Sequence, residues 1–310
     1  MVAAVFSLLA GRVWLPPGEI VFRHDPLALL IVADIRLPRT VLGLLIGASL
    51  GLSGAVLQGL TRNPLAEPAL LGVSTGAALG AVIAIYFGIS GIFGIAGPLL
   101  GLLGALAAAL LTFGLGRGGG TITLILAGAA VSSLTAAGIA LALNFAPNPY
   151  AAYEIMDWLL GSLADKSWTQ VWLVLPFIVA GCLLLATTGR ALDALSLGEA
   201  QAESLGVHLG RLRIAAVAGT ALAVGAATAV AGAIGFIGLV APHLARPFVG
   251  HQPSRILLPA TLLGALLLLV ADIAARLIHV GPELKLGVFT SLVGTPFFFW
   301  LVVRLKRTSP

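Results

Sequence analysis

The chain has 310 residues, of which 59% are hydrophobic and only 9% charged, with a formal net charge of +5. Soluble domains carry about 25% charged residues, so these charges could not cover the surface of a water-soluble protein. The basic residues stand singly rather than in a stripe with aromatics, which argues against nucleic acid as a partner. Apolar runs without strict polar alternation favour helices over a barrel. The composition therefore predicts an all-α integral membrane protein.

The first apolar stretch covers 1–10 and is followed by a proline-rich break at 12–22. The next apolar run, 38–60, is long enough to cross a bilayer as one helix. Its small residues recur at every fourth position and so share one face, which lets a neighbouring helix approach closely. These residues are Gly43, Gly47, Gly51, Ala55 and Gly59. The run at 69–87 repeats this spacing.

The remaining apolar runs predict further spans at 94–115, 121–144, 169–187, 213–232, 235–250, 256–278 and 284–303. Two segments between them differ in character. Residues 144–168 hold prolines, acids and aromatics, which predicts a short amphipathic helix at the membrane surface. Residues 188–213 form the longest polar segment, and its part LGEAQAESLGVHLGRLR, at 197–213, predicts two short helices broken at Gly206. Residues 1–310 are thus expected to form a single polytopic transmembrane domain of about ten helices.

Loop charge predicts the orientation, because basic residues favour the cytoplasmic side of a membrane. With the C-terminal tail inside, most basic residues and the segment 188–213 fall in the cytoplasm. The outer set consists of Arg12, Arg23, Arg36, Arg39, Lys166, Arg276 and Lys285. Two explanations stay open for the arginines at 36, 39 and 276. They pair with nearby acids, such as Asp34 or Asp272, or they dock an acidic extracellular partner.

Few residues are candidates for catalysis, nucleotide binding or metal binding. No GxxxxGK[ST] loop occurs, so ATP is not expected on this chain. The GxSxG match at 72–76 lies in an expected span and is a chance match, and no catalytic residue is expected. His243 is expected to be satisfied by a helix neighbour, and no histidine or cysteine spacing predicts a metal site.

Acidic residues bear on the driving force. Among them, only Asp272 lies within an expected span, and Arg276 follows it by one helical turn. Ion-driven transporters need unpaired acids or histidines at membrane depth. We therefore expect a membrane pathway powered by a separate motor. A stand-alone channel or ion-driven secondary transporter is the alternative.

Several segments occur in one order along nearly the whole chain: RLPRT, SGAVLQ, NPLAEPALLGVSTGAALG, LGEAQAESLGV, GAIGFIGLVAPH, RILLP, ADIAAR and ELKLGVFTSLVGTPFFFWLV. In these segments the chain resembles the permease subunits of ABC importers for iron-siderophores, haem and vitamin B12. The resemblance implies a type II importer permease in the bacterial inner membrane, surrounded by lipid. It implies a homodimer with a second permease copy, a pair of ATPase subunits that bind ATP and magnesium, and a periplasmic substrate-binding protein. No cofactor is expected on this chain itself.

The resemblance also implies roles for individual residues. Docking of the delivery protein is implied for Arg36, Arg39 and Arg276. The cytoplasmic gate is implied for Asn63, Leu65 and Thr121, although Ile122 replaces a serine of the family pattern. Coupling to the ATPase is implied for helices at about 191–210, with Leu197, Glu199, Glu203, Gly206 and Leu209.

The pathway is expected between the spans at 121–144 and 284–303 and the segment 147–165. No ligand cluster in these segments identifies the chelate, and we favour haem over siderophore or cobalamin. The first helix of the family is longer than 1–10 allows, so the sequence is expected to begin inside that helix.

Overall fold

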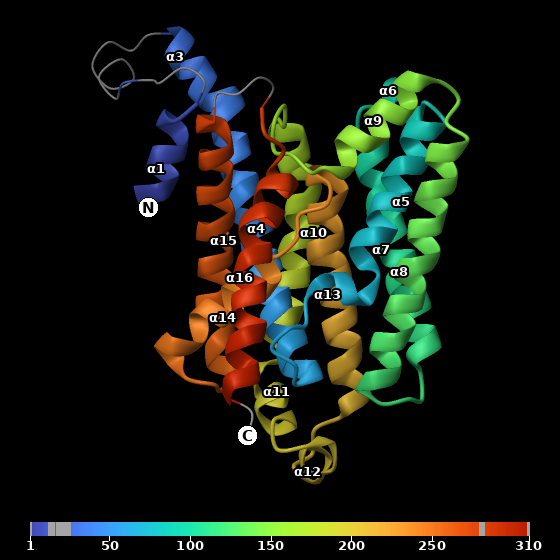
Figure 1. Ribbon diagram of the computed structural model, residues 1–310, viewed down its shortest axis with the longest axis vertical. Helices are drawn as coiled ribbons and strands as arrows, with labels where there is room; N and C mark the ends of the chain where they lie inside the picture. Colours follow the sequence, from blue (N-terminus) through green and yellow to red (C-terminus); the bar gives the residue numbers. More distant parts are fainter. Residues whose placement is uncertain (1, 12–15, 17–25, 279–282, 309–310) are drawn as a thin grey trace.

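The computed structural model describes residues 2–11, 16, 26–278 and 283–308. Within them all regular elements are helical (Figure 1). In chain order they are α1 (Val2–Leu9), α3 (Pro26–Leu30), η1 (Ile31–Arg36), α4 (Leu37–Thr61), η2 (Pro68–Leu71), α5 (Val73–Tyr86), α6 (Ile89–Ile92), α7 (Ala96–Gly116), α8 (Thr121–Asn144), α9 (Pro149–Leu159), α10 (Trp168–Ala186), α11 (Gly189–Leu195), α12 (Glu199–Ser204), α13 (Leu209–Ala231), α14 (Ile237–Val249), α15 (Pro253–Leu277) and α16 (Leu286–Thr308). Each expected span coincides with a helix in this series.

Two of the expected spans are only half-helices. In the described chain, 6 helices are long and apolar enough to cross a membrane: α4 with the turns before it, α7, α8, α10, α13 and α15. By contrast, α5 has 14 residues and α14 has 13. A rise of about 1.5 Å per residue cannot carry either across a core of about 30 Å. Irregular backbone precedes both, at 62–67 and 232–236, and at membrane depth it is tolerated only inside protein or along a cavity.

The small-residue face of α4 packs against α15, as its spacing predicts. A Cβ atom added at Gly47 or Gly51 would overlap backbone carbonyl oxygens of α15. Gly43 and Gly59, at the ends of the same face, contact side chains instead. Gly54, outside the expected set, lies against the backbone of α14. These backbone contacts hold α14 against the second half of α4 and so fix the depth at which α14 begins.

The two ends of the bundle are built differently. One end carries α3, α6 and α9 with the start of α4, and the other carries α11 and α12 (Figure 1). Arg36 and Arg276 lie at the first end, where both bind the last turn of α1. The outer arginines and the segment 191–210 are therefore at opposite ends, as the expected orientation requires. Arg12 and Arg23 lie outside the described residues.

The amphipathic helix expected within 144–168 is confirmed as α9 (Pro149–Leu159), and its place at the membrane surface stays a prediction. The Asn148 side chain accepts a hydrogen bond from the backbone N–H of Ala151 at 2.9 Å and so caps the helix. Ile155 is buried, whereas Tyr150 and Tyr153 are exposed. This division of faces is that of an amphipathic helix.

The helix break expected at Gly206 is present. Helix α12 ends at Ser204, Gly206 has a φ of 84°, and α13 begins at Leu209. The second helix is not short, however, because it is the beginning of the long helix α13. A further short helix, α11, precedes α12, and the chain turns between them at Gly198, whose φ of 118° is one that glycine tolerates better than other residues.

Candidate functional site

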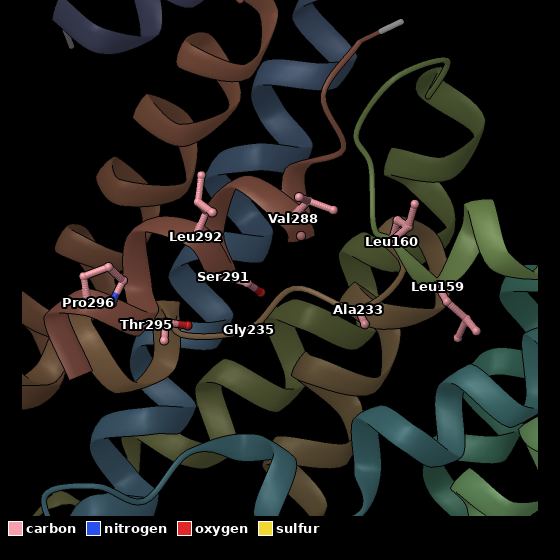
Figure 2. A pocket seen from close by; sticks show the side chains of 10 residues that line it. Leu159, Leu160, Ala233, Gly235, Val288, Ser291, Leu292, Thr295 and Pro296 are labelled. Carbon is pink, nitrogen blue, oxygen red and sulfur yellow. The ribbon is translucent and has the colours of Figure 1, made fainter. Parts of the chain in front are cut away.

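A cavity of about 780 Å³ lies between the end of α9, the irregular stretch 233–235 and α16 (Figure 2). Most of its wall is apolar, with leucine, valine, alanine and proline side chains. The exceptions are Ser291 and Thr295, whose hydroxyl groups point from α16 toward the space beside 233–235 (Figure 2). Elements from the expected pathway, 147–165 and 284–303, therefore do meet at one cavity. The contribution of 233–235 is not visible in the sequence.

A second cavity of about 240 Å³ shares Leu159, Ala233 and Gly235 with the first. Its wall includes Leu50, which lies in the middle of α4, and Ile139 of α8. The joined space is therefore at mid-depth in the bundle. The half-helices α5 and α14 begin beside it, which explains why irregular backbone is tolerated there.

Glu67 lines this second cavity. Phe236, the residue before α14, lines the same cavity. From the sequence, Asp272 is the only acid expected at membrane depth, and this expectation is incomplete. The sequence does not reveal Glu67 as such an acid, because this residue stands in a proline turn rather than in an apolar run.

At the outer end, Asp272 joins two arginines. Its side chain is 0% exposed. Arg276 donates from Nε to Asp272 Oδ2 at 2.8 Å, and Arg39 donates from Nη2 to Asp272 Oδ1 at 2.7 Å. Arg39 also pairs with Glu283. The pairing expected for Asp272 and Arg276 from their spacing is confirmed.

Two of these outer arginines also hold α1. Arg36 donates from Nη1 to the carbonyl oxygens of Leu8 at 2.9 Å and Leu9 at 2.6 Å. Arg276 donates to the carbonyl oxygen of Ser7 at 3.0 Å. The last carbonyl groups of a helix have no partner within it and attract cations. Arg36 and Arg276 are 7% and 5% exposed, so the geometry favours pairing within the chain. Docking by these arginines stays a prediction.

The expected gate residues lie on separate elements at the inner end. Asn63 and Leu65 follow the end of α4, where Asn63 Oδ1 accepts a hydrogen bond from the N–H of Leu65 at 2.9 Å. Thr121 is the first residue of α8. A gate closed by these residues stays a prediction.

The residues expected to couple the permease to the ATPase differ in their exposure to solvent. Leu197, with 65% of its surface exposed, and Glu203 and Gly206 face the solvent around α12. Leu209 is buried and anchors the start of α13 rather than offering a surface. Leu205 is 63% exposed beside them and was not anticipated. Their role in coupling stays a prediction.

Glu199 faces the bundle instead. Its Oε1 accepts a hydrogen bond from Thr121 Oγ1 at 2.8 Å and another from Arg213 Nη2 at 3.0 Å. These bonds, first that from Thr121, together with the Arg213 charge, hold the pKa of Glu199 below its ordinary value. One residue expected at the gate and one expected in the coupling helix are therefore in direct contact. Arg213 was missed, because no helical spacing relates it to Glu199.

His243 has the neighbours expected of it. Its Nδ1 lies 3.4 Å from Nη1 of Arg246, one turn along α14, and its ring contacts Phe297 and Trp300. The described residues contain no group of three or more metal-ligating side chains.

Known proteins share the sequence of this chain over most of its length. The profile of the FecCD transport family matches residues 1–304. The vitamin B12 import system permease protein BtuC of Klebsiella pneumoniae is 41% identical over 99% of this chain and 91% of its own length. BtuC of Escherichia coli O9:H4 (strain HS) is also 41% identical, over 99% of this chain and 93% of its own.

Solved structures share the same architecture. An inward-facing ABC transporter described as of the metal-chelate type superposes with a TM-score of 0.88 at 33% identity, over 98% of this chain and 96% of its own. PsaBC from Streptococcus pneumoniae, at 17% identity and a TM-score of 0.60, shares the fold alone.

Proposed function

Because the chain belongs to the FecCD transport family and is the permease subunit of an ABC importer, we propose that it carries vitamin B12 from the periplasm into the cytoplasm. The observation that carries the choice of substrate is the 41% identity to BtuC over 99% of the chain. The sequence analysis favours haem without a ligand cluster that identifies the chelate, and this preference yields to the identity with BtuC. Haem and ferric siderophores remain outcomes of the test.

The class of protein is plain from the family. This is a multi-pass protein of the bacterial inner membrane and a transport component rather than an enzyme. A stand-alone channel or ion-driven carrier is therefore set aside. We propose that a second copy of this chain completes the pathway. We further propose that a pair of ATPase subunits with ATP and magnesium drives transport, and that a periplasmic protein delivers the substrate.

The cavities support this proposal. Their walls are largely apolar, and their polar side chains are Ser291 and Thr295 in the first cavity and Glu67, Ser74 and Thr75 in the second. Such a wall holds no set of ligands for a bare metal ion, and a bulky pre-formed complex can slide along it. In this scheme the outer end receives the substrate and the exposed leucines near α12 receive the motor.

A transport measurement tests the substrate. The complete importer, with its cognate ATPase and delivery protein, is reconstituted in liposomes and offered labelled cyanocobalamin, haemin or a ferric siderophore. We expect ATP-dependent uptake of cyanocobalamin alone, and binding of cyanocobalamin by the delivery protein in titration calorimetry.

The control is the same complex with an ATPase variant that binds ATP without hydrolysing it, which should abolish uptake. Uptake of haemin or of the siderophore in place of cyanocobalamin would overturn the substrate. Uptake without the ATPase would overturn the mechanism as well.

A further inference from the structure

Four residues connect the coupling helix α12 to the inner end of α8. Glu199 of α12 binds Thr121 and Arg213 through Oε1, at 2.8 Å and 3.0 Å. Arg213, in the second turn of α13, also donates from Nη1 to the carbonyl oxygen of Gly119 at 3.0 Å. We call Gly119, Thr121, Glu199 and Arg213 the Glu199 clasp. It joins three elements that are far apart in the sequence.

The clasp places a carboxylate at the first residue of α8. The residue before α8 is Gly120, which has no side chain to offer as a cap, and Gly118 and Gly119 precede it. The carboxylate of Glu199 accepts a hydrogen bond from the hydroxyl of Thr121, the first residue of α8. The N-terminus of a helix favours a negative charge beside it. A side chain of α12 therefore binds the N-terminal end of α8.

The glycine loop before α8 leaves this end of the helix free to move relative to α7. Residues 118–120 join α7 to α8 and are all glycine, and Gly118 has a φ of 82°. A glycine run is flexible, so the backbone of α7 constrains the start of α8 only weakly. The bond from Thr121 to Glu199 instead ties this end of α8 to α12. At its other side, Arg213 ties the clasp to α13, whose length is mostly buried among other helices.

The position of the clasp relates the two functional ends of the chain. The exposed Leu197 and Leu205 flank α12 on the inner face, where a motor can press on it. Helix α8 runs from the clasp to the cavity, to which it contributes Ile139. Motion of α12 can thus change the wall of the pathway without any contact between the motor and α8.

We propose that the Glu199 clasp is the link through which movement of α12 is transmitted to α8 and the pathway. Glu199 acts through Thr121 rather than by touching the ATPase, and Arg213 is a positioning residue that orients its carboxylate. The inference rests on the proposed function as a motor-driven permease. It goes beyond it in naming the connection and in assigning Arg213.

Transport and hydrolysis measured together test the link. In the complete reconstituted importer we compare Glu199→Ala, Thr121→Val and Arg213→Met for substrate moved per ATP hydrolysed. Each should lower this ratio by about fivefold or more, the lower end of typical coupling between sites, while hydrolysis continues. The double variant Glu199→Ala/Thr121→Val should be no worse than Glu199→Ala alone, because that change already removes the bond to Thr121.

Matched controls come from the same turns of chain. Thr123→Val removes an exposed hydroxyl two residues along α8, and Arg211→Met removes an exposed guanidinium two residues before Arg213. Both should keep the wild-type ratio. A silent Thr121→Val beside a damaging Glu199→Ala would overturn the proposal, since Glu199 would then act on the ATPase directly. Additive losses in the double variant would overturn it too.

A distance measurement does not depend on the substrate. Spin labels are placed at the exposed Ala200 of α12 and Leu126 of α8, with Cys182 replaced by serine. In the wild-type background the distance between the labels should stay narrow and unchanged when the ATPase binds ATP. In Thr121→Val it should broaden and shift.

An equally narrow, unshifted distance in Thr121→Val would reject the clasp whatever the importer carries. Conversely, if the label distances are as expected but cobalamin is not transported, only the proposed substrate is rejected.

Discussion

The outer and inner ends of the chain each carry a network of charged side chains, and the two are built in opposite ways. At the outer end, the Asp272 cluster (Arg36, Arg39, Arg276, Asp272 and Glu283) is largely shielded from water and makes many bonds. At the inner end, the Glu199 clasp has a single carboxylate, whose side chain is 37% exposed. Both join elements that are distant in the sequence.

The difference indicates what each network does. A buried ion pair loses much free energy when one partner is removed, because the remaining charge stays desolvated. Such a network holds its elements in one arrangement, here α1, α4 and α15. A half-exposed pair is weaker, since water can replace its bonds when it opens. The clasp can therefore follow α12 or release it at small cost, as a moving connection requires.

The largest effect is expected from Asp272→Asn. The substitution keeps the shape of the side chain but leaves Arg276 without its buried counter-charge. We expect a loss of about 3–5 kcal/mol in the free energy of unfolding, measured from unfolding in detergent followed by tryptophan fluorescence. The matched control is Asp193→Asn at the inner end, a less buried carboxylate, which should cost less. Equal stability of Asp272→Asn and wild type would show that the outer network is not the rigid one.

A smaller loss is expected from Arg36→Met, which removes the bonds from Nη1 to Leu8 and Leu9. A hydrogen bond to a charged group contributes about 1.5–3 kcal/mol, and because both bonds leave the same Nη1 group we expect them together to contribute within this range. The loss should be confined to α1. Hydrogen exchange of residues 2–11 should rise, while affinity for the delivery protein at low salt stays unchanged. Lost affinity with unchanged exchange would instead establish Arg36 as a docking residue.

How far the sequence predicts the fold depends on the kind of backbone. Long apolar runs predict helices well, and the span expected at 121–144 coincides with α8, Thr121–Asn144. The run at 69–87 is as apolar, yet Gly72 adopts a φ of 72° and divides η2 from α5. Composition cannot reveal this division, because irregular backbone next to a buried cavity needs the same apolar residues as a helix.

The contacts of the candidate site also differ in how far the sequence predicts them. Asp272 and Arg276 are one helical turn apart, so their pairing follows from spacing alone. Glu199 and Thr121 lie 78 positions apart, and no local period relates them. Their separate roles could be inferred from the resemblance, but their contact depends on how α8, α12 and α13 pack. The same holds for Glu67, whose depth depends on the path of an irregular turn.

A still smaller effect is expected from Asp157→Asn. Asp157 of α9 pairs with Lys285 at 2.7 Å, and both side chains are partly exposed. Exposed pairs contribute about 0.2–1 kcal/mol, so the free energy of unfolding should fall by no more than this. The difference from wild type should shrink further in high salt. A loss as large as that of Asp272→Asn would mean that exposure does not separate rigid from adjustable networks here.

The smallest effect is expected from pH, and it concerns the clasp. The hydrogen bond from Thr121 and the charge of Arg213 lower the pKa of Glu199, so the folded state favours its ionised form. The stabilisation from this ionised form is present above the ordinary glutamate pKa of about 4.3 and is lost only as the pH falls through the lowered value. Substrate moved per ATP hydrolysed should therefore be constant between about pH 6 and pH 8.

Glu199→Gln provides the comparison, because glutamine keeps an acceptor oxygen but cannot ionise. If the wild-type ratio falls between about pH 8 and pH 6 and the Glu199→Gln ratio does not, Glu199 must bind a proton in that range. Its pKa would then be raised rather than lowered, and the bonds from Thr121 and Arg213 could not be the ones that hold it. A fall shared by both forms would point to another group and would leave the clasp intact.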